Sequence, residues 1–170
     1  MTTRDMSKDA QPDEIKRMSE MIKDIDFAML TTQEHDGTLR SRPMSTQEVE
    51  FDGDLWFFTG MESGKVAEIK EDQQVNVSYA DKDEQRYVSV SGKAKVLRDQ
   101  QKIDELWSPA LKVWFPNGKD DPNVGLIKVD VTQAEYWDSS SNSMVRVAQF
   151  AKALVTGDHE DMGKNRKINL

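Results

Sequence analysis

Apolar and polar residues alternate along several stretches of this chain, which is the pattern of strands with one buried face. The alternation is clearest in Gln74–Tyr79 and Tyr87–Leu97. Other apolar runs predict four more strands, at Phe27–Thr32, Thr38–Phe51 (bent at Pro43), Leu55–Thr59 and Gly125–Trp137. Turn formers separate these strands and favour hairpin connections, at His35-Asp36-Gly37, at Asp52-Gly53 and between residues 81 and 85.

Helical spacing occurs before and between the predicted strands. Pro12-Asp13-Glu14 opens a helix with acids where the helix dipole favours them. One apolar face follows it, formed by Ile15, Met18, Ile22 and Ile25. Further helices are expected at residues 63–71, 99–107, 108–114 and 144–153. Residues 1–12 are polar and predicted to be disordered, and residues 139–170 are expected to form a C-terminal helix and a mobile tail.

These elements predict a mainly β fold in a single domain, residues 13–138. About six strands with hairpin connections, and no long alternation of strand and helix, favour antiparallel pairing that closes into a small barrel with flanking helices. The alternative is an open antiparallel sheet with helices on one face.

Composition narrows the function classes. The 170 residues are 36% hydrophobic and 32% charged with a net charge of −8, which disfavours general binding of nucleic acid or anionic membranes. There is no cysteine, so disulfides and thiolate nucleophiles are excluded. No apolar run reaches the length of a membrane span, and we expect a cytoplasmic protein. The two histidines, His35 and His159, offer no metal-ligand spacing and no recognisable acid–base machinery, so we expect no metal site.

The segment Leu55–Ile69, LWFFTGMESGKVAEI, points to a ligand. Its apolar run ends at Thr59-Gly60, a loop with Ser63, Gly64 and Lys65 follows, and an amphipathic run begins at Val66. This is a strand, a turn and the start of a helix. Free backbone N–H groups and the helix dipole make such a place attractive to a phosphate.

Two arginines precede this segment in one strand. Arg40 and Arg42 share a face because side chains alternate, and a pair of arginines can clasp an anion. We expect the hairpin through Asp52-Gly53 to place this strand beside Leu55–Thr59, so that the arginines and the Lys65 loop meet around one phosphate. The alternative is that the arginines lie on a solvated outer face.

Trp137 ends the last long strand and is followed by polar residues. It could border a pocket and cover a planar ligand, although packing in the core is the commoner use of a tryptophan.

Four motifs now stand in a recognisable order: Arg40-x-x-x-x-Ser45, then F-F-T-x-x-x-S-x-K from Phe57 to Lys65, then V-S-G-K-A, then E-Y-W ending at Trp137. In this order the chain resembles the pyridoxamine 5′-phosphate oxidase-like, FMN-binding split-barrel superfamily, and within it the bacterial general stress proteins. Residues 106–129 look like the insert of the latter. The similarity covers about residues 15–137.

The resemblance implies a six-stranded split barrel that binds FMN, with FAD as an alternative, between two subunits of a homodimer. Arg40 would reach the phosphate, Ser63 and Lys65 would hold it, and Tyr87 would approach the cofactor across the dimer interface. The full set of cofactor-binding residues implied is Arg40, Ser41, Arg42, Pro43, Met44, Phe58, Thr59, Ser63, Gly64, Lys65, Tyr87 and Trp137.

The chain departs from the oxidase pattern on the substrate side. Ser143 and Val145 stand where the arginine and histidine that meet the substrate would be, and Ser45 replaces a lysine. Gly64 replaces an arginine in the phosphate loop. The resemblance therefore implies a flavin-binding stress protein without vitamin B6 oxidase activity.

Two further functions remain open at this point. One is a flavin-dependent oxidoreductase that reduces a small molecule with a nicotinamide or deazaflavin donor. The other is a dimeric split-barrel interaction module that binds no flavin.

Overall fold

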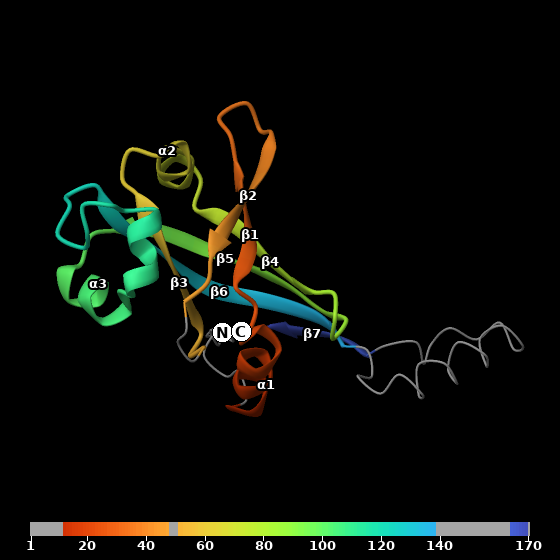
Figure 1. Ribbon diagram of the computed structural model, residues 1–170. Coiled ribbons are helices and arrows are strands. Elements are labelled where there is room, and N and C mark those ends of the chain that lie inside the picture. The colour runs from red at the N-terminus through yellow and green to blue at the C-terminus, as the bar shows by residue number, and fades with distance from the viewer. Residues whose placement is uncertain (1–11, 48–50, 139–163, 170) are drawn as a thin grey trace, which may run out of the picture.

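The computed structural model describes residues 12–47, 51–138 and 164–169. Seven antiparallel strands form a single sheet in the order β2-β1-β4-β5-β6-β3, and β7 pairs with the second half of β6 (Figure 1). The strands are β1 (Phe27–Gln33), β2 (Leu39–Ser45), β3 (Asp54–Gly60), β4 (Gln74–Asp81), β5 (Arg86–Leu97), β6 (Val124–Asp138) and β7 (Lys164–Asn169). The helices are α1 (Pro12–Ile22), α2 (Gly64–Glu71), α3 (Gln100–Leu106) and the short 3-10 helix η2 (Pro109–Val113).

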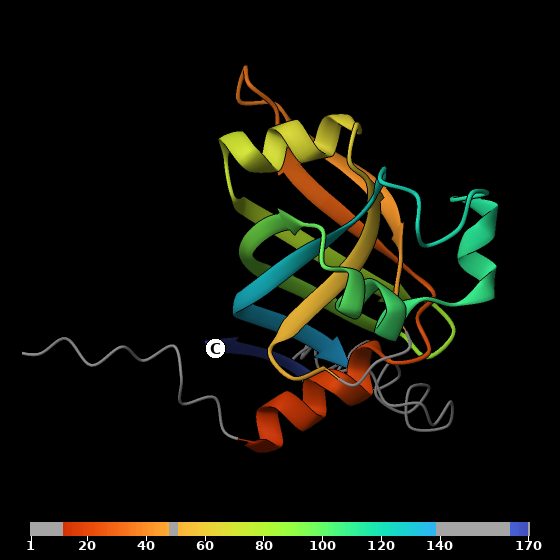
Figure 2. The same cartoon turned by 90° about the vertical axis from the view of Figure 1, so that its left-hand side faces the viewer.

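The first six strands curl into a half-barrel that surrounds the main hydrophobic core (Figure 2). Figure 2 shows α1 across one end of the curl and α2 across the other. Alternate residues of the strands point inward, where Leu30, Phe57 and Val90 are almost completely buried. The inward residues of α1, led by Met18 and Met21, close the core at one end.

A second, smaller core lies on the outer face of β3 and β6, beneath α3 and η2. Phe58 and Leu126 from the strands pack there against Ile103 and Leu106 of α3 and Leu111 of η2. Residues 98–123 therefore cover one part of the outer sheet surface. The insert expected at residues 106–129 supplies the later part of this cover and the first residues of β6.

The described elements confirm the mainly β prediction and the approximate positions of six strands and four helices. Gly37 and Gly53 adopt positive φ angles of 88° and 114°, as the two predicted glycine turns require. The predicted helix at residues 144–153 lies outside the described residues.

Three expectations were wrong in detail. The second strand ends at Ser45 instead of continuing to Phe51, which is buried in the main core. The turn at Asp52-Gly53 does not pair β3 with β2, because β3 pairs with β6. Lys164–Asn169 was expected in a mobile tail but forms β7, antiparallel to Gln133–Asp138.

Candidate functional site

The first turn of α2 is the starting point of the site. Ser63 occupies the N-cap position, but its side chain makes no capping hydrogen bond. Its Oγ atom is buried and has no hydrogen-bond partner among the described residues. Buried hydroxyl groups normally have a partner, so this one is available to a ligand that approaches the helix N-terminus. The first N–H groups of a helix have no acceptor within it, and they lie in the same place.

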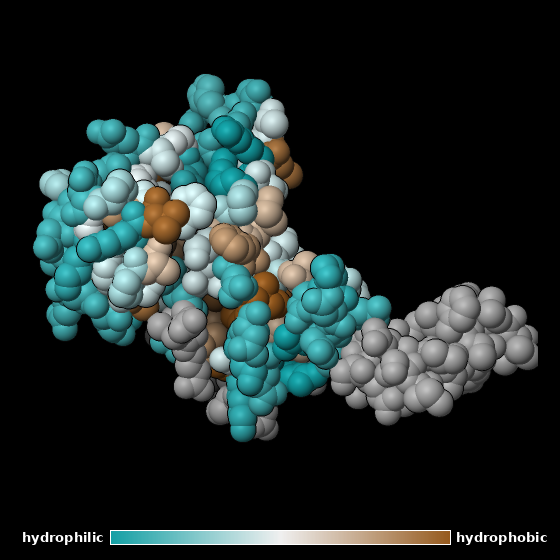
Figure 3. All heavy atoms as spheres, in the orientation of Figure 1, coloured by the Kyte–Doolittle hydropathy of each residue, from teal (hydrophilic) through white to brown (hydrophobic). Residues whose placement is uncertain are grey.

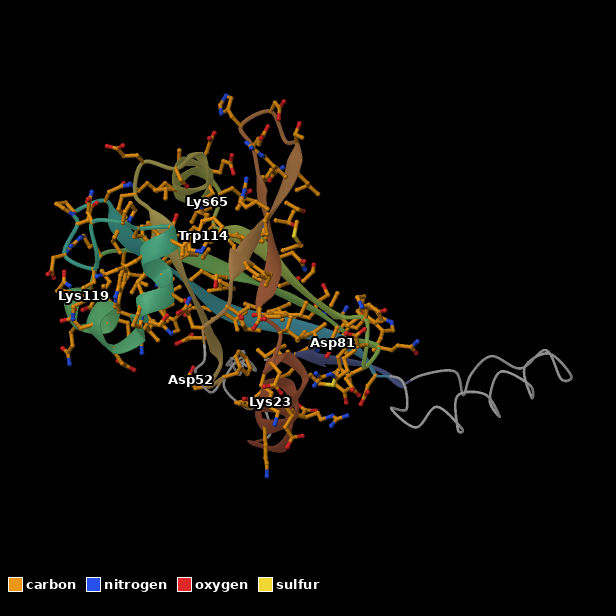
Figure 4. All side chains as sticks on the ribbon, in the orientation of Figure 1. Lys23, Asp52, Lys65, Asp81, Trp114 and Lys119 are labelled. Carbon is orange, nitrogen blue, oxygen red and sulfur yellow. The ribbon has the colours of Figure 1, made fainter. Side chains whose placement is uncertain are left out.

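Cationic side chains from β2 lie close to this turn. Arg42 is mostly buried, with 16% of its side chain exposed, and Arg40 is largely solvent-accessible. Burial, and after it the charge of Arg42, lowers the pKa of the Lys65 ammonium, while Glu68 acts in the opposite direction. Lys65 belongs to the first turn of α2, which lies beside the β1–β2 hairpin in the view of Figure 4. We call Arg40, Arg42 and Lys65 the cation cluster.

In the part of the chain that the structure describes, β2 and β3 do not pair as the predicted hairpin required, yet the cation cluster exists. β2 and β3 lie at opposite edges of the sheet, and the curl of the sheet brings these edges into contact. Arg40, Arg42 and Met44 alternate onto the inner face of β2, toward α2 and the core. The prediction that both arginines share a face is therefore consistent with the register, although its geometric reason was wrong.

Two polar residues of the site were not identified from the sequence. Arg42 Nη1 donates to Thr32 Oγ1 of β1 at 2.5 Å, and Arg42 Nη2 donates to Glu68 Oε2 of α2 at 2.8 Å. Thr32 Oγ1 in turn donates to Glu68 Oε2 at 2.5 Å. Glu68 follows Lys65 by about one helical turn, and this spacing is the feature of the sequence that could have indicated a contact between them. Among the many acidic residues, however, the pattern gave no reason to single it out.

The other residues of β2 face the opposite side or the core. Ser41 lies on the outer sheet face, where its hydroxyl is 2.6 Å from Thr31 Oγ1. Pro43 is exposed on the same face opposite Met29, whereas Met44 is buried in the main core. These three side chains do not join the cation cluster.

Phe58 and Thr59 are both buried at the end of β3. The Phe58 ring lies 5.7 Å from Trp107 and 6.3 Å from Phe115 between ring centroids, within the smaller core. The Thr59 hydroxyl donates to the carbonyl of Gly60 at 3.2 Å. Gly64 is exposed at the first position of α2.

Tyr87 and Trp137 lie opposite each other on β5 and β6. Both are exposed on the outer face, at 42% and 41%. They are near the β4–β5 turn, and Figure 4 shows Asp81 of that turn at the far end of the molecule from Lys65. A single chain therefore does not bring this aromatic pair to the cation cluster.

The outer sheet face around this pair carries further apolar side chains. Phe27 and Met29 of β1 are 56% and 40% exposed and lie on the same face as Tyr87 and Trp137. We call these four residues the outer aromatic face. Ser78 and Ser89 lie in the same row of the sheet as Met29, and Asn76 of the next row donates to Ser89 Oγ at 2.9 Å. Exposed apolar patches of this kind are typical of interaction surfaces.

The described residues contain no group of three or more His, Cys, Asp or Glu side chains placed to hold a metal ion. No described helix is long and apolar enough to cross a membrane. Among the described residues, the first turn of α2, the Ser63 hydroxyl without a hydrogen-bond partner and the cation cluster together offer groups that bind anions.

A sequence model of the family described as "Pyridoxamine 5'-phosphate oxidase like" matches residues 13–161. Protein bli-3 of Neurospora crassa is 33% identical over 165 residues, which cover 91% of this chain and 79% of that protein.

Two solved structures show the same architecture. A general stress protein 26 from Jannaschia sp. CCS1 has a TM-score of 0.75 and 25% identity, with 93% of this chain and 99% of that chain covered. A general stress FMN/FAD binding protein from Xanthomonas citri has a TM-score of 0.64 and 28% identity, with coverage of 72% and 87%. The split-barrel fold is thus shown, and the protein belongs to the pyridoxamine 5′-phosphate oxidase-like family.

Proposed function

We propose that this protein binds a flavin nucleotide, FMN or FAD, as a general stress protein without vitamin B6 oxidase activity. The observation that carries the proposal is the buried hydroxyl of Ser63 at the N-terminus of α2, which has no hydrogen-bond partner in the described part of the chain and lies next to the cation cluster. The name of the Xanthomonas citri relative, which includes FMN/FAD binding, supports the same ligand.

The residues fit the phosphate of a flavin nucleotide. Ser63 Oγ and the N–H groups of the first turn of α2 would donate to phosphate oxygens, and Lys65 and Arg42 would neutralise their charge. Arg40, more exposed, would reach the phosphate from the solvent side. When bound, the flavin ring supplies any redox chemistry, and the protein holds and orients it.

The surface beside the cluster suits the flavin ring. Figure 3 shows apolar residues gathered in the middle of one face, between η2, the β1–β2 hairpin and α1, with hydrophilic residues around them. A ring system placed there would be shielded from water on one side while its phosphate stays at α2.

We further propose that a second copy of the chain covers the outer aromatic face. Tyr87 and Trp137 are remote from the cation cluster of their own chain, so a homodimer is the arrangement that would let them approach a flavin held by the partner. The four large apolar side chains exposed there also favour burial against another surface.

The test is a titration of the purified protein with FMN, FAD and riboflavin, followed by flavin fluorescence and by the shape of the absorbance bands. We expect FMN or FAD to bind more tightly than riboflavin, because riboflavin lacks the phosphate. Unchanged fluorescence with all three flavins would contradict flavin binding and favour a flavin-free interaction module.

The flavin-loaded protein then separates a passive carrier from an oxidoreductase. Under anaerobic conditions, bleaching of the flavin by NADH or NADPH would indicate a reductase. We expect no bleaching by pyridoxamine 5′-phosphate, because Ser45, Ser143 and Val145 replace the residues that meet that substrate in the oxidase pattern. Bleaching by that substrate would contradict the absence of B6 oxidase activity.

A further inference from the structure

The carboxylate of Glu68 lies inside the proposed phosphate site. Its Oε1 atom folds back along α2 and lies 3.9 Å from the position that a Cβ atom on Gly64 would occupy. Its Oε2 atom accepts from Thr32 and from Arg42. Only 13% of the side chain is exposed. The chain thus places its own anion beside the first turn of α2, where a ligand phosphate would also be favoured.

This carboxylate forms an ion pair with Arg42, the less exposed of the two arginines in the cation cluster. Arg42 uses one nitrogen for Thr32 and another for Glu68, so a ligand must share this guanidinium with Glu68. Glu68 offsets one of the three positive charges of the cation cluster, and Glu34, whose Oε1 lies 3.5 Å from Arg40 Nη1, offsets part of another at the more exposed edge of the cluster.

Glu68 remains ionised at neutral pH. Burial alone would raise the pKa of its carboxyl. The hydrogen bond from Thr32 lowers this pKa, and so do the positive charge of Arg42 and the hydrogen bond that Arg42 donates. Together these three effects outweigh burial, so the pKa is lowered. Arg40 on the same strand acts in the same direction, and Lys65 is the cation that faces Glu68 from its own helix.

Flavin nucleotides differ in the charge that they bring to such a site. The phosphate monoester of FMN has a second pKa of about 6, as other phosphate monoesters do, and is doubly charged at pH 7.5. Each phosphate of the FAD diphosphate carries a single charge. A fixed carboxylate repels the doubly charged group more strongly.

We infer that Glu68 is a specificity-determining residue that competes with the ligand phosphate for Arg42 and reduces the preference of the site for FMN over FAD. This inference rests on the proposed flavin binding.

The experiment compares wild type with Glu68→Gln at pH 7.5 and low ionic strength, by fluorescence titration with riboflavin, FMN and FAD. The amide keeps the shape of the side chain and removes its charge. We expect the affinity for FMN to rise about tenfold in the variant and the affinity for FAD to rise less. The affinity for riboflavin should be unchanged, because riboflavin has no phosphate. Glu71→Gln is the matched control, since Glu71 is exposed at the end of α2 and contacts His35, and it should leave all three affinities unchanged.

Glu68→Ala removes the same charge without an amide near Arg42 and should give the same order of effects. Weaker FMN binding in Glu68→Gln, or equal changes for the three flavins, would overturn the inference and leave Glu68 as a support for Arg42. Loss of folding in both variants, seen by circular dichroism, would also overturn it. If wild type binds none of the flavins, the proposed function itself fails, which is a distinguishable result.

Discussion

Lys65 shows how a single residue can report on the ligand phosphate. It lies in the first turn of α2, partly buried and close enough to Arg42 for that charge to lower its pKa. Keeping two cations near each other is unfavourable unless an anion balances them. In the free protein Glu68 provides part of this balance, and in the complex the phosphate would provide the rest.

Replacing Lys65 by alanine is therefore expected to weaken FMN binding by about tenfold or more, because a charge-assisted contact to phosphate is lost. Riboflavin, which has no phosphate, should lose almost nothing. Fluorescence titration of both ligands measures the difference. Lys70→Ala, at an exposed position in the last turn of the same helix, is the control. Equal losses for both ligands would mean that Lys65 does not contact the phosphate.

Ser63 gives an independent prediction because its hydroxyl has no hydrogen-bond partner among the residues that the structure describes. An ordinary N-cap serine stabilises its helix by about 1 kcal/mol through a side-chain hydrogen bond, but this bond is missing here. Ser63→Ala should therefore leave the free energy of unfolding of the apo protein unchanged or slightly higher, and should weaken FMN binding. Urea unfolding tests the expected stability of the apo protein, and FMN titration tests the expected loss of affinity. A clear loss of apo stability would show that the hydroxyl already has a structural role.

At the scale of the elements, α2 and α3 form a contrasting pair. Asp99 caps α3 by accepting from the backbone N–H groups of Gln101 and Lys102, at 3.0 and 3.2 Å. The helix so fixed supplies Ile103 and Leu106 to the smaller core, which also contains Phe58. The N-cap of α3 makes its hydrogen bonds within the protein, whereas the N-cap hydroxyl of α2 makes none to the described residues, which is why we propose that it serves a ligand.

We expect Asp99→Ala to lower the free energy of unfolding by about 1 kcal/mol, because two backbone donors lose their acceptor. FMN affinity should change little, since Asp99 is outside the cation cluster. Chemical denaturation of this variant beside Ser63→Ala makes the comparison direct. If the two variants have the same stability, the assignment of one cap as structural and the other as functional is wrong.

The positions of the elements could be predicted from the sequence because they depend on local patterns. Alternation in Gln74–Tyr79 and Tyr87–Leu97, and glycines at the turns, are visible within a few residues. The strand Lys164–Asn169 was missed because it contains a single apolar residue, Ile168, so no alternation can be seen. Its pairing with β6 is a property of the folded sheet.

The arrangement of the site depended on contacts distant in sequence and was predicted only in part. The two arginines and Lys65 were identified from their residue types and positions. The pairing of β3 with β6 was not predicted, because turn residues do not determine with which strand the following strand pairs. Glu68 was missed for the same reason. Its significance comes from Thr32 and Arg42, which lie 36 and 26 residues away in sequence.

At the scale of the whole molecule, the proposed site is divided between two places. The cation cluster lies at the α2 end of the half-barrel, where Figure 4 labels Lys65. Tyr87 and Trp137 pair with each other next to the β4–β5 turn, whose residue Asp81 Figure 4 shows at the other end. If both contribute to one flavin, the protein must act as a dimer, and flavin affinity must depend on dimerisation.

Trp137→Glu tests this dependence, because it places a charge in the centre of the proposed interface, where an unpaired buried charge is costly. We expect the variant to sediment as a monomer in analytical ultracentrifugation and to bind FMN at least about tenfold more weakly, although its cation cluster is intact. Lys65→Ala should instead lose FMN affinity and remain a dimer. Trp114→Glu is the control for oligomeric state, since Trp114 is 64% exposed but follows η2, away from the outer aromatic face. A Trp137→Glu protein that stays dimeric and keeps its FMN affinity would refute the shared site, because both effects come from the same burial of Trp137 against the second chain.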